Sequence, residues 1–230
     1  MLAPGRSGVS TMVTAIKAEQ SNGPAVLEAN GISFAYPQGA FVFEGINFSV
    51  AAGQRIAISA PSGAGKSTLC QVLAGYAPPA QGQVLFNGKP LAQVREPGKP
   101  NPVQLIWQHP EQVLDPYMRV GKSIQEAYGF SGAVSEELQR ALGIKPDWLV
   151  RFPHELSGGE LQRCCIARTL ACAPRIIIAD EISTMLDAIT QVHIWEVLLA
   201  YCKQNNAGLV LVTHSPALQE RLATQVFVLP

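Results

Sequence analysis

The stretch SAPSGAGKSTL, residues 59–69, decides the fold class of this chain, because it is close to a loop that binds phosphate. Such loops read G-x-x-x-x-G-K-[ST], and Gly65, Lys66 and Ser67 supply the second half of the pattern. Ala60 stands where the first glycine belongs. Glycine is required there only if the backbone needs a positive φ or if a Cβ would collide with the ligand. We therefore expect Ala60 to be a minor variation that leaves the loop functional.

The segments around this loop give it the context that a phosphate-binding loop needs. Residues 54–59 (QRIAIS) are a short apolar run, and residues 66–75 read as a helix that ends at a glycine. Two further runs, RIIIADE at 175–181 and GLVLVTH at 208–214, are typical of buried parallel strands that end in polar groups. A strand, a loop and a helix in this order predict an α/β fold.

The loop and the helix after it predict a nucleotide site. Backbone N–H groups in a glycine-rich turn point at a phosphate, and the positive N-terminal end of the helix adds to the attraction. Lys66 is placed to reach the β- and γ-phosphates, and the Ser67 hydroxyl to bind Mg²⁺. The competing interpretation is a glycine-rich turn before an ordinary helix. The residues expected to contact the nucleotide are Ala60, Pro61, Ser62, Gly63, Ala64, Gly65, Lys66, Ser67 and Thr68.

Two carboxylates end the apolar run IIIADE, and both suit a nucleotide site. Asp180 fits the carboxylate that holds Mg²⁺ through water in phosphate-loop enzymes. Glu181 follows where a carboxylate could polarise the water that attacks the γ-phosphate. Acidic residues after a strand often cap the next helix instead. The companion loop at 59–69 favours the catalytic interpretation.

The segment LSGGE, residues 156–160, admits two interpretations. Ser157 and Glu160 have the spacing of a capping box, which would open a helix running to about Pro174. Capping does not explain Gly158 and Gly159, because each glycine in a helix costs about 1 kcal/mol relative to alanine. Two glycines in a first turn allow a bulky group to approach the backbone, and a helix N-terminus favours an anion. The segment therefore indicates a second phosphate-binding surface.

Composition limits the classes of protein to consider. The hydrophobic fraction is 47% and the charged fraction 15%, so disorder is not expected over most of the length. Seventeen basic residues balance seventeen acidic ones, which argues against a nucleic-acid partner. The five cysteines lack metal-binding spacing, and we expect them to be small buried residues in a reducing cytosol. No apolar run approaches the roughly 20 residues of a membrane helix.

The rest of the chain predicts two subdomains. Residues 25–36 and 43–53 alternate apolar and polar side chains, as antiparallel strands with one solvent-facing side do. Residues 117–155 show helical periodicity, in pieces such as VGKSIQEAYGF and VSEELQRALGI. The predicted boundaries are a flexible tail at 1–24, in which Met12 could equally be the start, and one domain at 25–230, with a core at about 25–110 and 165–230 and a helical subdomain at about 111–164.

The order of these motifs resembles one family. A phosphate loop, LSGGE-LQR, IIIADE and a strand-ending VTH occur together in the ATP-binding cassette (ABC) ATPases, and the resemblance covers essentially all of residues 25–230. It implies an ABC-type P-loop NTPase core with an antiparallel β subdomain and an inserted α-helical subdomain. It also implies ATP and Mg²⁺ as ligands and ATP hydrolysis as the activity.

Four further residues take roles from this resemblance. Gln108 in IWQHP matches a glutamine that contacts Mg²⁺, and Tyr36 in SFAYP matches the aromatic residue that stacks on adenine. Asp187 in STMLDA matches the aspartate of the D-loop, and His214 matches a histidine that senses the γ-phosphate. A core aromatic at a strand end is the competing interpretation for Tyr36, and a structural histidine for His214.

Two longer segments of the sequence resemble the branch of peptide, nickel and metal-chelate importers. The segments WQHPEQVLDPYMRVGKSI and DEISTMLDAITQ carry this likeness. His109 and Asp115 depart from the more usual FQDP and LNP of that branch. The chain ends at VFVLP, directly after an expected core strand, so we expect no regulatory domain.

The resemblance implies a set of partners and a place in the cell. In ABC dimers, ATP is sandwiched between the loop of one chain and LSGGE of the other, so we expect a head-to-tail dimer with an identical or related subunit. Two permease subunits would dock near residues 108–120, with a periplasmic or extracellular substrate-binding protein, at the cytoplasmic face of the cell (inner) membrane. The alternatives are a catalytically silent half of a heterodimer and a soluble ABC protein of DNA repair or translation. The transported substrate is left open.

Overall fold

The computed structural model describes residues 27–37, 39–129 and 135–230. The predicted tail and the residues between the two predicted helical pieces lie outside this range. The described residues divide into two compact units. We call residues 106–174 and 182–206 the helical unit, and residues 27–105, 175–181 and 207–230 the sheet unit. The subdomain boundaries expected from the sequence stay a prediction.

The sheet unit contains an antiparallel sheet with the strand order β2-β1-β4-β5. Its strands are β1 (Leu27–Ala35), β2 (Phe41–Val50), β4 (Gln81–Phe86) and β5 (Lys89–Pro90). β1 pairs with β2 from Leu27 opposite Val50 to Ala35 opposite Phe41. Burial alternates along the second half of β2, where Ile46, Phe48 and Val50 are buried and their neighbours are exposed. The antiparallel strands predicted from alternation are confirmed.

A second sheet in the same unit has the order β6-β7-β8-β3-β9. Its strands are β3 (Arg55–Ser59), β6 (Val103–Ile106), β7 (Ile176–Asp180), β8 (Gly208–Val212) and β9 (Gln225–Val228). β8 pairs in parallel with both β3 and β7, and every residue of β7 and β8 is buried. Adjacent parallel strands bring their carboxyl ends to one edge of the sheet. The α/β class predicted from the sequence is confirmed.

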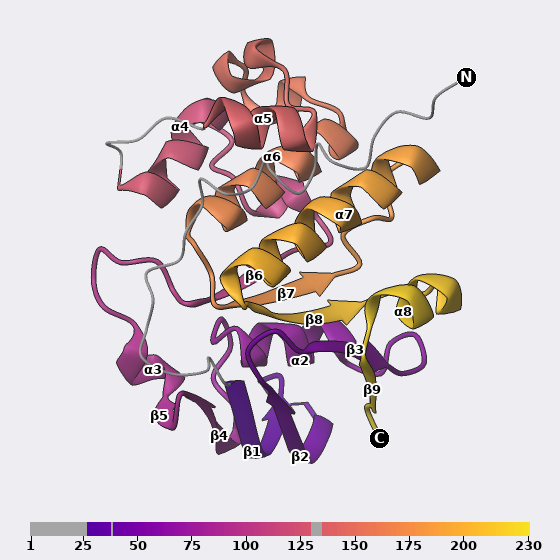
Figure 1. The fold of residues 1–230 in the computed structure, drawn as a ribbon. Helices are drawn as coiled ribbons and strands as arrows, with labels where there is room; N and C mark the ends of the chain where they lie inside the picture. Colours follow the sequence, from indigo (N-terminus) through magenta and orange to yellow (C-terminus); the bar gives the residue numbers. More distant parts are fainter. Residues whose placement is uncertain (1–26, 38, 130–134) are drawn as a thin grey trace. The chain divides into compact units, whose positions relative to one another are not determined.

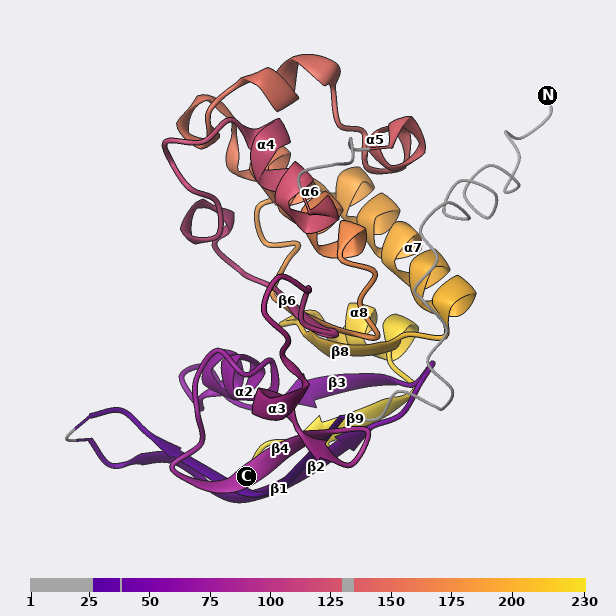
Figure 2. The same cartoon turned by 90° about the vertical axis from the view of Figure 1, so that its left-hand side faces the viewer.

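Helix α2 (Lys66–Leu73) lies between the two sheets of the sheet unit (Figures 1 and 2). Its Leu69, Cys70, Val72 and Leu73 side chains are fully buried. The Phe48 ring of β2 meets the Phe227 ring of β9 edge-on, with centroids 5.2 Å apart, so the two sheets also touch directly. The core of this unit therefore holds the helix that follows the phosphate loop.

The described residues of the helical unit form four α-helices and four short 3₁₀ helices. The α-helices are α4 (Val120–Gln125), α5 (Glu136–Leu142), α6 (Gly158–Ala171) and α7 (Ala188–Asn205). The 3₁₀ helices are η1 (Pro110–Gln112), η2 (Glu126–Tyr128), η3 (Pro146–Val150) and η4 (Pro153–Glu155). α6 packs against α4 and α5. It begins where LSGGE predicted a helix start and ends at Ala171, three residues before the predicted end.

Several elements were not predicted from the sequence, and two of them show why. The unpredicted elements are α3 (Leu91–Val94), α7, α8 (Pro216–Leu222), β4 and β5. α7 has apolar residues on more than one side, since Trp195 and Leu198 are buried while Ile189 is 85% exposed. β4 is interrupted by Gly82, and its first three residues are exposed. Neither element shows a clean period in its sequence.

Gly82 offers a test of the antiparallel sheet. Its φ is +75°, and a Cβ there would lie 2.4 Å from the carbonyl oxygens of Asn30 and Gly31. Left-handed strain of about 1–2 kcal/mol would add to this backbone collision, so we expect Gly82→Ala to lower the free energy of unfolding by more than about 3 kcal/mol. Urea denaturation followed by circular dichroism measures the loss.

Gly88 supplies the matched control for this measurement. Its φ is also +75°, but a Cβ there would meet nothing within 4 Å. Gly88→Ala should therefore cost only the left-handed strain, about 1–2 kcal/mol. Equal losses in the two variants would contradict the close approach of β4 to β1.

Candidate functional site

The phosphate loop runs from the end of β3 to α2, and its shape explains why alanine is accepted at its start. Gly63 and Gly65 have φ of +79° and +89°. A Cβ at Gly65 would also lie 2.5 Å from Val42 Cγ1, so glycine is required there for two reasons. Among the described residues, the non-glycine positions with positive φ do not include Ala60. The alanine therefore carries no left-handed strain.

Lys66 is folded back onto its own loop. Its Nζ donates hydrogen bonds to the carbonyl oxygens of Ala60 at 3.0 Å and Pro61 at 2.9 Å, and the residue is 7% exposed. α2 begins at Gly65 with no side-chain cap, whereas Ser157 caps α6 and Asp187 caps α7. A helix start without a cap leaves its first N–H groups to another acceptor. The loop thus presents a cation and an uncapped helix end together.

The edge formed by β7 and β8 carries the predicted catalytic carboxylate. Glu181 has φ +48°, and its N–H donates to the Val212 carbonyl oxygen at 3.1 Å. Its Oε1 lies 2.6 Å from His214 Nε2, and the side chains are 11% and 55% exposed for glutamate and histidine. The contact with His214 and the backbone bond hold Glu181 in a conformation that non-glycine residues rarely adopt. The structure therefore joins two predicted site residues, Glu181 and His214.

Cys70 of α2 is a buried thiol whose pKa is shifted by its surroundings. Burial raises the pKa of its thiol well above the ordinary value, and the negative charges of Asp180 and Glu181 raise it further, while Lys66 lowers it. The thiol therefore stays in its neutral form.

Tyr36 lies at the end of β1, beside the first turn of α2. Its hydroxyl is 3.0 Å from Thr68 Oγ1, and the residue is 53% exposed. The ring meets Phe34 edge-on, with centroids 5.2 Å apart. An exposure of 53% does not fit the interpretation of Tyr36 as a core aromatic, and it leaves the ring open to a planar ligand.

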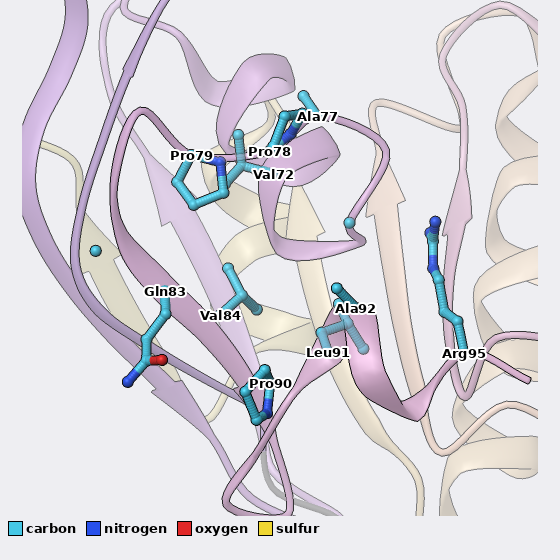
Figure 3. A pocket seen from close by; sticks show the side chains of 12 residues that line it. Val72, Ala77, Pro78, Pro79, Gln83, Val84, Pro90, Leu91, Ala92 and Arg95 are labelled. Carbon is cyan, nitrogen blue, oxygen red and sulfur yellow. The ribbon is translucent and has the colours of Figure 1, made fainter.

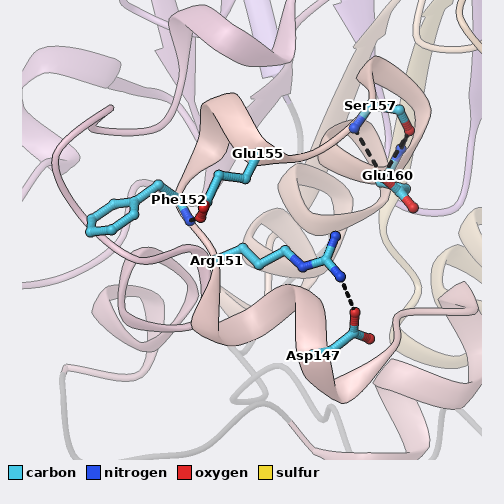
Figure 4. A network of polar contacts seen from close by, with 6 residues as sticks. All are labelled: Asp147, Arg151, Phe152, Glu155, Ser157 and Glu160. Carbon is cyan, nitrogen blue, oxygen red and sulfur yellow. Dashed lines mark hydrogen bonds and ion pairs between the residues drawn. The ribbon is translucent and has the colours of Figure 1, made fainter.

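In the helical unit, the capping box predicted for LSGGE is confirmed (Figure 4). Glu160 N–H donates to Ser157 Oγ at 3.4 Å, and Ser157 N–H donates to Glu160 Oε2 at 2.9 Å. The hydrogen bond from the Ser157 backbone lowers the pKa of the Glu160 carboxyl, and the bond from its hydroxyl lowers it further. Ser157 and Glu160 thus have a structural role whatever else they bind.

The two glycines of LSGGE also have a reason inside the chain, which the sequence did not reveal. A Cβ at Gly158 would lie 2.8 Å from Met185 Sδ, and one at Gly159 would lie 3.2 Å from the Met185 carbonyl oxygen. Residues 185–186 therefore lie directly against the first turn of α6. Close packing within the chain gives a reason for these glycines, and the approach of an anion stays a prediction.

A hollow of ≈ 430 Å³ opens beside this helix start. Its lining residues are Ser157, Gly158, Gly159, Glu160, Arg163, Met185, Leu186, Asp187 and Thr190. It unites the predicted LSGGE residues with the predicted Asp187. Sequence reasoning missed Arg163, Met185, Leu186 and Thr190 as lining residues.

The missed Thr190 had a recognisable sequence signal. Asp187 Oδ1 accepts hydrogen bonds from the N–H groups of Ile189 at 3.1 Å and Thr190 at 3.0 Å, and its Oδ2 accepts from Thr190 Oγ1 at 2.6 Å. These bonds, the one from the Thr190 hydroxyl first, lower the pKa of the Asp187 carboxyl. An aspartate three residues before a threonine is the spacing of a helix start, and it marks the beginning of α7.

Gln108 and the two departures from the importer pattern also lie in the helical unit. Gln108 follows β6 by two residues. His109 Nδ1 is 3.2 Å from Glu111 Oε1. Asp115 Oδ1 accepts from the Tyr117 N–H at 2.8 Å, a bond that an asparagine oxygen could equally accept. The departure at Asp115 therefore preserves the turn. The sheet unit holds the other predicted residues, which are the loop, Tyr36, Asp180, Glu181 and His214.

A second hollow of ≈ 520 Å³ lies elsewhere in the sheet unit (Figure 3). It is lined mainly by apolar side chains from the end of α2, the following turn, β4 and α3, among them Pro78, Pro79, Pro90 and Leu91. None of the residues predicted to bind nucleotide lines it. It is separate from the candidate site.

The described residues contain neither a membrane-spanning helix nor a cluster of metal-ligating side chains. No helix among them is long and apolar enough to span a bilayer. No group of three or more histidine, cysteine, aspartate or glutamate side chains among them is arranged to hold a metal ion.

Comparison with known proteins supplies relatives over most of the chain. The family described as ABC transporter matches residues 43–184. The nickel import ATP-binding protein NikE of Pseudomonas putida is 33% identical over 82% of this chain and 73% of its own length. The glutathione import ATP-binding protein GsiA of Salmonella paratyphi A is 31% identical over 90% of this chain. The chain spans 37% of the length of GsiA.

A solved structure supports the same assignment. The ATP-binding subunit of an ABC transporter superposes with a TM-score of 0.77 and 27% sequence identity, over 89% of this chain and 85% of its own. The importer resemblance carried by the motifs is confirmed by NikE and GsiA. On the family match and the identity with NikE, the chain belongs to the ABC transporter family.

Proposed function

We propose that this chain is the subunit that binds and hydrolyses ATP to drive a membrane ABC importer. The observation that carries the proposal is that the phosphate loop, Asp180 and the Glu181–His214 pair all belong to one unit, with Glu181 in contact with His214. The capped LSGGE hollow in the other unit supports it, because the same chain then carries both faces of a sandwiched nucleotide. Phosphate binding at an uncapped glycine-rich helix start is the physical basis.

The sheet unit holds the nucleotide in this proposal. Backbone N–H groups of residues 63–68 surround the phosphates, and Lys66 Nζ exchanges the carbonyl oxygens of Ala60 and Pro61 for phosphate oxygens. A phosphate is the better partner because it is charged and the carbonyls are not. The exposed Tyr36 ring stacks on adenine.

The oxygen donors of the site fit Mg²⁺. The Ser67 hydroxyl and the Asp180 carboxylate are hard ligands, and Mg²⁺ bound with phosphates needs only one or two such groups from the protein. The ion would neutralise charge on the phosphates.

Glu181 acts as the general base, and His214 orients it. The carboxylate takes a proton from the attacking water while the bond between the γ-phosphoryl group and ADP breaks. The 2.6 Å contact with His214 fixes the direction of the carboxylate, and its low exposure limits competition from bulk water. Lys66 stabilises the negative charge of the transferred group.

The second face of the nucleotide comes from another cassette. Ser157, Gly158 and Gly159 contact the γ-phosphate bound by the partner, and Asp187 lies at the same face. A chain that carries both faces forms two complete sites when two copies pair head to tail, so a second copy is the favoured partner. A related cassette would serve in the same way.

The importer assignment rests on NikE and GsiA, whose names state nickel and glutathione import. We therefore propose nickel, metal-chelate or peptide substrates, two permease subunits, a substrate-binding protein, and a place at the cytoplasmic face of the inner membrane. The permeases dock on residues 108–120, where Tyr117 is 90% exposed. This large exposed aromatic side chain supports an interface there.

The loop can be tested through Lys66 and Ala60. Lys66→Ala should abolish ATP turnover, because the cation at the phosphates is lost. Ala60→Gly should change the affinity for ATP by less than about tenfold, since Ala60 is not strained. Phosphate release and equilibrium binding of ATP measure the two effects. An inactive parent that Ala60→Gly rescues would overturn the assignment of the loop.

The LSGGE face can be tested without disturbing its capping role. Aspartate and asparagine both cap helices well, but only aspartate brings a negative charge toward a phosphate. Ser157→Asp should therefore reduce turnover at least about a hundredfold, and Ser157→Asn by less than about tenfold. Melting temperatures of both variants show whether the cap is kept. Equal turnover in folded Ser157→Asp and Ser157→Asn chains would mean that Ser157 only caps the helix and does not contact a phosphate.

A further inference from the structure

The start of α4 is joined to the segment that leads into LSGGE. Val120 N–H donates to the Arg151 carbonyl oxygen at 2.9 Å. The Arg119 guanidinium donates to the Val150 carbonyl oxygen, and it lies 5.0 Å from the centroid of the Phe152 ring. A charged donor on a carbonyl and a cation over a ring are both favourable contacts. Three successive residues, 150–152, are thus held by Arg119, the residue before α4, and by Val120, its first residue.

The backbones also approach closely at this junction. A Cβ at Gly121 would lie 2.7 Å from the Leu149 carbonyl oxygen and 3.1 Å from Leu149 Cβ. The carbonyl belongs to η3 and cannot rotate away as a side chain could. The first turn of α4 therefore lies in direct backbone contact with η3.

The other side of η3 is joined to the first turn of α6. Trp148 is 2% exposed, and the Arg163 guanidinium lies 4.6 Å from its ring centroid. Arg163 Nε donates to the Gly159 carbonyl oxygen at 3.3 Å, and its Nη1 to the Gly143 carbonyl oxygen at 3.2 Å. The side chain that rests on η3 therefore also touches a signature glycine.

Polar contacts also connect residues in the segment between η3 and LSGGE (Figure 4). Arg151 Nη2 is 2.6 Å from Asp147 Oδ2. Phe152 N–H donates to Glu155 Oε2 at 2.7 Å, and the Ser157–Glu160 capping box follows directly. Side-chain contacts therefore link residues 147 and 151, 152 and 155, and 157 and 160 between η3 and the LSGGE hollow.

We propose that Arg119 is a positioning residue for the LSGGE face: through η3, Trp148 and Arg163 it fixes the signature glycines relative to the start of α4. The inference rests on the proposed function, since it assigns the LSGGE face to a nucleotide held by a partner chain. It goes further by naming η3 as the bridge and an exposed arginine, remote in sequence from LSGGE, as its anchor. Arg119 itself touches no nucleotide.

Arg119 suits a clean experiment because it lies on the surface. Its removal leaves no cavity in the core and no change in the sheet unit, where ATP first binds. Loss of Arg119 should therefore spare the binding of MgATP by the single chain and weaken the step in which LSGGE closes on the nucleotide of a partner. A merely structural residue would affect both or neither.

The test measures two constants in the Glu181→Gln chain, where hydrolysis is slowed. The dissociation constant for MgATP is measured with dilute monomer, and the dimer dissociation constant in MgATP by sedimentation. Arg119→Ala should change the dissociation constant for MgATP by less than about twofold and raise the dimer dissociation constant about tenfold. Arg119→Lys, which keeps the charge and a donor, should recover most of the dimer affinity.

Arg140 is the matched control, because it is another exposed arginine of the helical unit and pairs with Glu136 at 3.9 Å. Arg140→Ala should change neither constant. Unchanged dimerisation of Arg119→Ala, or an equal loss in both of its constants, would overturn the inference alone. A parent that fails to bind MgATP, or that binds it and does not dimerise, would overturn the proposed function and the inference with it.

Discussion

The parallel pairing of β7 with β8 is the constraint on which the candidate site depends. It sets Asp180 opposite Val212, so that the residues following both strands emerge at one edge of the sheet. Glu181 then meets His214 at 2.6 Å, although 33 positions separate them in the sequence. The left-handed conformation of Glu181 costs about 1–2 kcal/mol. Its contact with His214 and its backbone bond to Val212 oppose that cost.

Sequence reasoning reached the parts of the fold whose patterns are local. The buried runs at 175–181 and 208–214 predicted β7 and β8, and the loop at 59–69 predicted the strand and helix around it. Helix α7 was not predicted because its apolar residues do not keep to one side of the helix. Strand β4 was not predicted because Gly82 breaks its alternation of apolar and polar residues. Tertiary packing decides such elements, and a single sequence does not display it.

The candidate site divides in the same way. Lys66, Glu181, His214 and the LSGGE residues could be named because motifs fix their spacing. Arg163 and Met185 could not, because their place beside LSGGE depends on how α6, η3 and residues 185–186 pack. Packing also changes the meaning of Gly158 and Gly159. They accommodate Met185 and Leu186 within the chain, and the phosphate-binding interpretation of LSGGE stays a prediction.

The central claim is that Lys66 and Ser157 act on one nucleotide from different chains. The most direct measurement mixes two inactive chains, one with Lys66→Ala and one with Ser157→Asp, and follows phosphate release. A mixed dimer of these chains has one intact site, so random pairing should restore about a quarter of the parent turnover. No recovery, with mixed dimers present, would contradict the account, because it would place both residues in the site of a single chain.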